Sequence, residues 1–355
     1  MKRFNLRVEV LAMVVLSIAG AFVLAGCGGS ASGDDTKNMV YGSAESKLSM
    51  EPVTGPLFEG PALSIAPEVK PAPNATEHRV RIDVNHAEVT VNDTIKFTGW
   101  FFGGAYPGPV LHVRQGDRVF FKMTNRSNET VGISPPSPHS IDFHAAMVNP
   151  KDKYRELIPG ATIEFEWTAN YPGVYMYHCG SPAILQHMIY GMVGMTIVEP
   201  KDGYPTKVDR EYALFQSELY LARLKSGMYV TDMATAKKKD PIFVCFNGQP
   251  FRHVKEPLKA KAGERVRLYV LNSGPCGTSS FHVVGTLFDR VWMEGNPRNE
   301  MRGVATVMLP SSGAAIVEFV VPEKGIYTFV DHEFADVEAG AAGLIDASGE
   351  EVAMK

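Results

Sequence analysis

The stretch VRQGDRVFFKMTN at residues 113–125 indicates the fold class, because it recurs as AKAGERVRLYVLN at residues 260–272. In the first of these stretches, side chains alternate in character from Arg118 to Met123. Alternation with a period of two over four to eight residues is typical of a β-strand that buries one face. The chain therefore contains a β-rich unit and a second version of that unit.

Two further pairs of segments extend this repeat. They are PGATIEF at 159–165 with SGAAIVEF at 312–319, and PGVYMYH at 172–178 with KGIYTFVDH at 324–332. Short alternating runs that are broken by Gly, Pro and Asn indicate a β-sandwich, and we find no pattern of a long amphipathic helix. We therefore expect two β-sandwich domains in tandem, at residues 78–200 and 208–346.

The composition excludes several classes of protein. Of the 355 residues, 45% are hydrophobic and 21% are charged, which argues against collagen, coiled coils and global disorder. The formal net charge of −4 argues against a nucleic-acid partner. The 33 Gly and 24 Pro residues suit short strands joined by turns. Four Cys residues are too few for a fold built on disulfides.

The N-terminus has the pattern of an export signal. Residues 1–26 begin with basic side chains and continue with the apolar run Val10–Val23. This run leads into LAGC at residues 24–27, which resembles the lipobox of bacterial lipoproteins. We expect an exported protein with a lipid on Cys27, anchored to a membrane and facing the periplasm or the cell exterior. Residues 27–77 are rich in Gly and Ser and then in Pro, and predict a flexible linker. A soluble exported protein with an incidental Cys is the alternative.

One group of residues points to a copper site. Cys179, His187 and Met192 follow the spacing Cys-x7-His-x4-Met, and His139 precedes them. A thiolate, two imidazoles and a weak thioether are the ligands of a type 1 electron-transfer copper. A structural zinc site is the alternative, but zinc takes Cys, His and carboxylate ligands.

Two more histidines indicate a second metal. Successive side chains of a strand face opposite ways, so His178 faces away from Cys179. His144 lies five residues after His139, an odd separation that sends it to the far face of a regular strand. His332 is the equivalent position in the second copy and supplies a third imidazole. Three histidines with an open position are typical of a catalytic metal.

The absence of the His-x-His motif limits the class of reaction that the chain can catalyse. Multicopper oxidases require a trinuclear cluster that several His-x-His pairs supply. The chain contains no His-x-His sequence, and Cys179 is followed by Gly180. Four-electron reduction of oxygen is therefore disfavoured, and a one-electron reaction at a mononuclear copper fits these residues.

Over residues 78–346 these motifs resemble the two-domain copper-containing nitrite reductases. The resemblance implies an all-β fold of two tandem cupredoxin-like Greek-key β-sandwich domains. It implies dissimilatory-type reduction of nitrite to nitric oxide and water, with one type 1 and one type 2 copper per subunit. It also implies a cupredoxin or c-type cytochrome as electron donor, and a homotrimer whose type 2 sites are shared between subunits. The ligands that it implies are His139, Cys179, His187 and Met192 for type 1 copper, and His144, His178 and His332 for type 2 copper.

The resemblance further assigns three residues around the substrate. The family's catalytic aspartate falls on Asp142, its catalytic histidine on His282, and the aliphatic residue that covers the copper on Val284. Reduction of nitrite to nitric oxide and water consumes two protons, which a carboxyl group and a histidine can supply. The alternatives are a carboxylate that orients His144 and a histidine that only fills the core.

Some positions depart from the family or match none of its sites. Val284 is shorter than the isoleucine common there, Leu287 stands where many members carry a histidine, and residues 145–157 do not resemble the expected loop. Whether Cys245 and Cys276 form a disulfide is open. We interpret the remaining histidines as surface or turn residues; they are His78, His86, His112 and His253.

Two other functions are weighed against nitrite reduction. A non-catalytic cupredoxin electron carrier or copper-holding protein needs only the type 1 ligands, so His144, His178 and His332 argue against it. A small copper oxidase that acts on metals or phenols is disfavoured by the missing His-x-His pairs.

Overall fold

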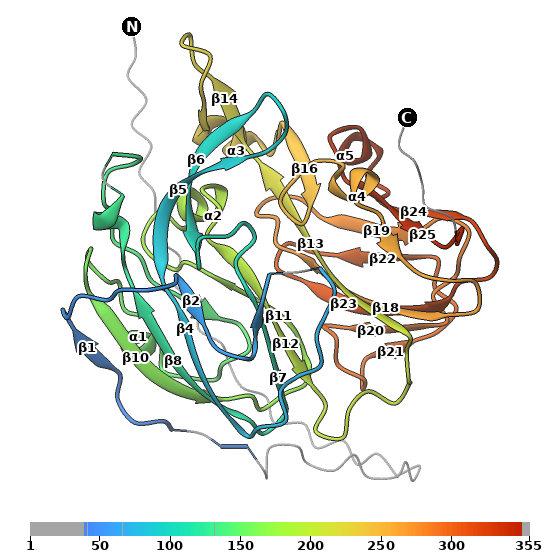
Figure 1. The fold of residues 1–355 in the computed structure, drawn as a ribbon, viewed down its shortest axis with the longest axis horizontal. Helices are drawn as coiled ribbons and strands as arrows, with labels where there is room; N and C mark the ends of the chain where they lie inside the picture. Colours follow the sequence, from blue (N-terminus) through green and yellow to red (C-terminus); the bar gives the residue numbers. More distant parts are fainter. Residues whose placement is uncertain (1–38, 41, 66, 131, 350–355) are drawn as a thin grey trace, which may run out of the picture. The chain divides into compact units, whose positions relative to one another are not determined.

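The computed structural model describes residues 39–349 except 41, 66 and 131. The predicted signal peptide and Cys27 lie outside the described residues. Within them, β-strands make up most of the regular structure, which confirms the all-β prediction (Figure 1). No described helix has the length and the apolar character needed to cross a membrane.

The described helices are short, and none contains more than six residues. This agrees with the absence of a long amphipathic pattern in the sequence. They are α1 (Pro150–Lys153), α2 (Ile184–Ile189), α3 (Met233–Lys238), α4 (Arg252–Lys255) and α5 (Phe334–Glu338), with a 3-10 helix at Ser127–Glu129.

Two sheets form the first sandwich. In spatial order, one contains β1 (Lys47–Ser49), β10 (Thr162–Thr168), β8 (Arg118–Thr124), β4 (Glu77–Ile82) and β2 (Phe58–Glu59). The other contains β3 (Leu63–Ser64), β7 (Val110–Arg114), β12 (Val193–Glu199), β11 (Gly173–His178) and β9 (Asp142–Phe143). Side chains from both sheets, such as Ile82, Phe121 and Leu111, are buried in the core between them. In β8, buried residues alternate with more exposed ones, as the sequence pattern predicts.

Two more sheets form the second sandwich. One contains, in order, β16 (Phe243–Phe246), β13 (Arg210–Leu219), β18 (Arg265–Asn272), β23 (Ala314–Val320), β20 (Arg290–Met293) and β21 (Glu300–Met301). The other contains β17 (Leu258–Lys259), β25 (Ala342–Asp346), β24 (Ile326–Asp331), β19 (Ser279–Val283) and β22 (Thr306–Leu309). The core between these sheets includes Leu268, Phe281 and Phe329, all fully buried.

The pairing of strands repeats between the sandwiches. β8 lies between β4, which is parallel to it, and β10, which is antiparallel. β18 lies in the same way between parallel β13 and antiparallel β23. β12 pairs with parallel β7 and antiparallel β11, just as β25 pairs with parallel β17 and antiparallel β24. The segments matched in the sequence therefore occupy equivalent strands.

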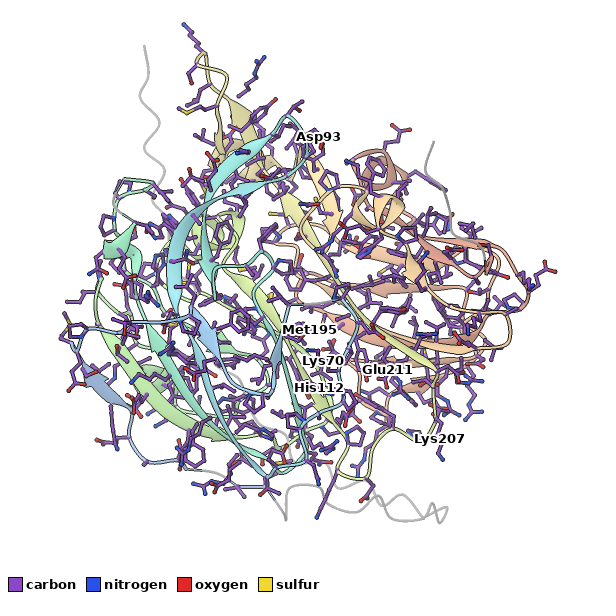
Figure 2. The ribbon with its side chains drawn as sticks, viewed as in Figure 1. Lys70, Asp93, His112, Met195, Lys207 and Glu211 are labelled. Carbon is purple, nitrogen blue, oxygen red and sulfur yellow. The ribbon has the colours of Figure 1, made fainter. Side chains whose placement is uncertain are left out.

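A third apolar core joins the two sandwiches, and the chain from Val40 onward forms one compact unit. Met176 and Met195 extend from β11 and β12 of the first sandwich toward Phe215 and Trp292 of the second (Met195 is labelled in Figure 2). β12 buries six of its seven residues, because one of its faces packs inside the first sandwich and the other against the second. Buried on both faces, such a strand is apolar almost throughout.

One small sheet takes strands from both halves of the chain. The hairpin β5 (Val84–Thr90) and β6 (Lys96–Phe102) is extended by β15 (Tyr229–Thr231) and β14 (Leu221–Arg223). β15 pairs with β6 through Tyr229 and Phe97. Phe97 is buried with Leu219 and Leu221 from the second half of the chain. We refer to these four strands as the shared sheet.

The flexible linker predicted over residues 27–77 is wrong for the part from residue 42 onward. Three short strands lie in it, and all belong to the first sandwich: β1 pairs with β10, β2 with β4, and β3 with β7. This segment therefore supplies both edge strands of one sheet and one edge strand of the other, instead of spacing the fold from the N-terminus.

The Pro-rich part of this segment is held by side chains of the first sandwich. Arg114 donates hydrogen bonds to the carbonyl oxygens of Ala72 (3.0 Å) and Pro73 (2.9 Å). The Nδ1 atom of His112 donates to the carbonyl oxygen of Lys70 at 2.8 Å, and Figure 2 shows these two residues side by side. Proline lacks an N–H group but keeps its carbonyl, so a Pro-rich chain can be ordered by donors from elsewhere.

Candidate metal centres

Three donor atoms meet in the first sandwich. His139 Nδ1 lies 3.3 Å from His187 Nδ1, which lies 3.2 Å from Cys179 Sγ, and all three are within 4.8 Å of one another. Two ligands at about 2.0–2.3 Å from one metal ion are about 3–4 Å apart in trigonal or tetrahedral geometry. All three side chains are buried. The arrangement fits one metal ion shielded from water.

Local backbone contacts place these ligands. Cys179 follows β11, His187 lies on α2, and Met192 precedes β12. The Cys179 N–H donates to the Met192 carbonyl at 3.2 Å, and the Met192 N–H donates to the His187 carbonyl at 3.1 Å. The loop thus closes on itself and holds Met192, which is fully buried, beside the other two. His139 is held by two backbone hydrogen bonds to Leu157, at 3.0 and 2.7 Å.

The electrostatics of this group suit a metal. Burial lowers the pKa of His139 to about 2 and that of His187 to about 4, so both imidazoles are neutral and free to coordinate. Burial raises the pKa of the Cys179 thiol, while the Ser140 N–H, which donates to Sγ at 3.3 Å, acts in the opposite sense. A bound cation would favour the thiolate that this site otherwise disfavours.

A second group lies nearby and is more exposed. The Nε2 atoms of His144 and His178 are 3.2 Å apart, and Asp142 Oδ2 lies 3.8 Å from His178 Nε2. His178 Nδ1 donates to the Cys179 carbonyl at 2.9 Å, so Nε2, which faces His144, is the ring nitrogen that can coordinate a metal. Burial, and then the neighbouring His178, lower the pKa of His144. The pair can therefore offer two ring nitrogens to a metal.

The two groups are joined by a single peptide bond. Cys179 is fully buried, whereas His178 belongs to the group with exposed His144. This is the arrangement expected from the alternation of a strand. The strand assumed between His139 and His144 is interrupted, however, because β9 contains only Asp142 and Phe143, and His139 pairs through an isolated bridge.

The histidines predicted in the second sandwich form a separate pair. His332 directly follows β24, and its N–H donates to the Ser280 carbonyl at 2.9 Å. The His282 and His332 rings are 4.9 Å apart between centroids. His282 Nδ1 donates to the Ala305 carbonyl at 2.6 Å, so its Nε2 is the nitrogen available for other contacts. Within the described part of one chain, His332 does not join the group around His144.

Large apolar side chains are exposed around this second pair. The Phe334 ring lies 5.1 Å from that of His332, and Met308 lies opposite Ser280 in the pairing of β19 and β22. Apolar patches larger than a few hundred Å² are rare on monomeric proteins and typical of interaction surfaces. We use the name apolar edge for four exposed side chains of this sandwich. Their exposed fractions are 48% for Val284, 62% for Leu287, 69% for Met308 and 70% for Phe334.

The interpretation of His78, His86, His112 and His253 as surface or turn residues is wrong. All four are exposed by 6% or less. Buried polar groups need partners, and His78 Nε2 lies 2.7 Å from Asp117 Oδ2. The partners of His78, His86 and His112 are 39 to 53 residues away in the sequence, so no local pattern reveals them.

His86 is the residue near the buried metal group that the sequence reasoning missed. Its Nε2 lies 2.9 Å from His139 Nε2. Burial lowers its pKa to about 4. The ring of Trp100 lies 5.1 Å from that of His139 and 5.0 Å from that of His187. Tyr190 stacks on the ring of Trp100 at 4.1 Å, so aromatic side chains line this side of the site.

The open question of a disulfide is also answered. Cys245 and Cys276 are both free thiols in the structure, the first buried and the second partly buried. Cys276 Sγ lies 3.5 Å from the carbonyl oxygen of Ala236.

Known proteins resemble this chain in sequence and in structure. A model of the multicopper oxidase family matches residues 83–203. The chain is 37% identical to the copper-containing nitrite reductase of Neisseria gonorrhoeae, over 94% of this chain and 87% of that protein. It is 39% identical to the copper-containing nitrite reductase of Neisseria meningitidis serogroup B, over 81% of this chain and 73% of that protein. The copper nitrite reductase structure from Nitrosomonas europaea superposes with a TM-score of 0.68 at 34% identity, covering 77% of this chain and 95% of that one.

Proposed function

The chain belongs to the copper-containing nitrite reductases, and on that premise we propose that its two groups of donor atoms hold two coppers for the reduction of nitrite to nitric oxide and water. The observation that carries this proposal is the adjacency of His178 and Cys179. One peptide bond joins a buried group suited to electron transfer with an accessible group suited to substrate. An electron carrier has no need of the second group.

The buried group has the donor set of a type 1 copper. Its four ligands would be His139, Cys179, His187 and Met192, which supply two nitrogens, a thiolate and a thioether. Copper at the two sites would take an electron from an outside donor and deliver it to nitrite. The protein's own part is to keep the first site dry, and all four side chains are exposed by 6% or less.

The accessible group would hold a type 2 copper once a third histidine is added. His144 and His178 come from one subunit, and we assign His332 of a neighbouring subunit as the third ligand. Two observations support this: His332 lies apart from the pair in one chain, and it sits beside the exposed apolar edge. Head-to-tail contacts of this kind can close into a ring, here a homotrimer.

We assign the supply of the two protons to Asp142 and His282. The Asp142 carboxyl lies 3.8 Å from His178 Nε2 and is partly exposed, so it can hold a proton next to the substrate. His282 has its Nδ1 engaged with a backbone carbonyl, so Nε2 can carry the second proton. The two residues are in different sandwiches and would meet only across the subunit interface. Val284, at the apolar edge, would then cover the substrate.

The first experiment measures copper and product together. Two coppers per chain with release of nitric oxide from nitrite support the proposal. One copper without turnover would indicate an electron carrier, and oxygen consumption with phenols or metal ions would indicate an oxidase.

A second experiment tests whether the site is shared. The inactive variants His144→Ala and His332→Ala are co-expressed or refolded together. If subunits share the site, some mixed trimers contain one interface with all ligands intact, and activity returns in part. If the site lies within one chain, no mixture is active. Sedimentation of an active monomer would also contradict the shared site.

We also propose that the enzyme is exported and anchored by a lipid on Cys27, with a cupredoxin or c-type cytochrome as its electron donor. Support for the anchor comes from the lipobox-like sequence. The variant Cys27→Ala is then expected to move from the membrane fraction to the soluble fraction and to lose incorporation of labelled fatty acid. Reduction of the protein by purified donors, followed in a stopped-flow instrument, tests the donor class.

A further inference from the structure

His86 contacts the predicted copper ligand His139 through the ring nitrogen that does not face the metal group. Its side chain is fully buried in β5, 53 residues before His139 in the sequence, and the two Nε2 atoms are 2.9 Å apart. The other ring nitrogen of His139 faces the metal group, 3.3 Å from His187 Nδ1. His139 is therefore held between the metal site on one side and His86 on the other.

The position of each proton follows from this geometry. A neutral imidazole that coordinates through Nδ1 carries its proton on Nε2. His139 then donates from Nε2, and His86 must accept with an unprotonated Nε2 and carry its own proton on Nδ1. Had both Nε2 atoms carried a proton, two donors would face each other at hydrogen-bond distance, which is repulsive. When His139 binds a metal through Nδ1, this contact becomes a hydrogen bond from His139 Nε2 to His86 Nε2.

The surroundings of His86 hold its ring in this orientation. His86 is directly opposite Trp100 in the pairing of β5 and β6, and their rings stack at 5.2 Å with an interplanar angle of 20°. Trp100 is itself held by stacking on Tyr190 and by a hydrogen bond from Nε1 to Ser134 Oγ at 3.2 Å. His86 has little freedom to turn away from His139.

We propose that His86 is a positioning residue of the type 1 copper site, which accepts a hydrogen bond from His139 and thereby makes His139 a stronger ligand for oxidised copper. The inference rests on the proposed type 1 site. Hydrogen bonds from a ligating histidine to an outer acceptor orient the ring and raise its basicity. A more basic ligand stabilises Cu(II) more than Cu(I), so His86 lowers the reduction potential of this copper.

The test compares two substitutions in the copper-loaded protein. His86→Phe keeps a ring that can stack on Trp100 but cannot accept a hydrogen bond, whereas Oε1 of His86→Gln can accept one. Loss of an outer-shell partner of this kind typically weakens metal binding about 10- to 100-fold. A tenfold loss confined to Cu(II) corresponds to a midpoint potential higher by about 59 mV. We expect this rise in His86→Phe and a return toward the wild-type potential in His86→Gln, followed by redox titration of the visible absorption.

His253→Phe is the matched control, because His253 is an equally buried histidine in the second sandwich. It is expected to keep the wild-type potential. An unshifted potential in His86→Phe, or an equal shift in His86→Gln and His86→Phe, overturns the role of His86. A wild-type protein without the intense visible band contradicts the proposed type 1 site itself, which separates the two failures.

A measurement without substitution covers the case in which His86→Phe does not fold. In reduced protein with 15N-labelled histidine, NMR spectra report which ring nitrogen carries the proton. We expect the proton on Nδ1 of His86 and on Nε2 of His139. A proton on Nε2 of His86 would overturn the inference.

Discussion

Substitution of Gly194 by Ala is expected to disturb both metal groups without touching a ligand. Gly194 in β12 lies directly opposite Tyr177 in β11, the residue before His178 and Cys179. A Cβ atom at residue 194 would lie 2.1 Å from Cζ of Tyr177. The Tyr177 ring is fully buried and cannot turn into solvent. The strand that positions the ligands would have to shift.

The expected loss of stability has two contributions, both from the ring of Tyr177. Relief of the clash requires a displacement of well over 1 Å, and such overpacking costs about 1–3 kcal/mol. The same movement breaks the hydrogen bond from the Tyr177 hydroxyl to the Pro109 carbonyl, now 2.6 Å long. Leaving these buried groups unpaired costs about 1–3 kcal/mol more. We therefore expect destabilisation of about 2–6 kcal/mol, which for a unit of this size is a fall in Tm of about 3–9 °C.

The assay is thermal unfolding of the metal-free protein by circular dichroism, together with the visible absorption after copper loading. Gly132→Ala is the control, because a Cβ at that position meets nothing within 4 Å. Adding Tyr177→Leu to Gly194→Ala removes the clashing ring, so the effects of the two changes should be less than additive by about 0.5–3 kcal/mol. If Gly194→Ala is as stable as Gly132→Ala and has the same spectrum, the reasoning is refuted.

Three other substitutions test the assigned roles, and a fourth tests the protonation of Asp336. Cys179→Ala should lose the intense visible absorption and donor-driven turnover while copper stays at the second site, since thiolate-to-copper charge transfer needs that sulfur; a coloured variant would contradict the assignment. Asp142→Ala and His282→Ala should each keep both coppers and lose turnover by roughly 10²–10⁴-fold, and activity within a few-fold of wild type would mean a purely structural role. Burial and then the nearby carboxylate of Asp331 raise the pKa of Asp336 from 3.8 to about 7. The stability that protonated Asp336 contributes is complete below pH 3.8 and lost as the pH rises through about 7. The Tm of Asp336→Asn minus the Tm of the wild type should therefore increase between pH 5 and pH 8. A difference in Tm that does not change with pH would contradict this.

The strand arrangement was predictable because its signal is local. The stretches at residues 113–125 and 260–272 became β8 and β18, in equivalent positions of two sheets. Alternation of side chains is a property of a few neighbouring residues, and it reports directly on which face of a strand is buried. The adjacency of His178 and Cys179 predicted two separate donor groups for the same reason.

The parts that the sequence did not predict depend on distant partners. The segment from residue 42 to 77 has no apolar pattern of its own, and its order comes from strands β4, β7 and β10 and from donors such as Arg114. His86 lies in a strand with no sign that its ring meets His139, 53 residues later. A buried polar side chain such as His86 is stabilised by a hydrogen bond to one specific residue, and no repeating pattern in the sequence identifies that residue.

The shared sheet limits how the gene can be divided. A fragment that ends before residue 208 would encode the first sandwich but omit β14 and β15. It would leave β6 with an open edge, and it would expose Phe97 and Met195, which the second half of the chain now covers. Exposed apolar faces and unpaired strand edges favour aggregation. Transplanting the first sandwich into another protein as a stand-alone electron-transfer module would therefore require residues 221–231 to be carried along, although they are encoded in the other half of the gene.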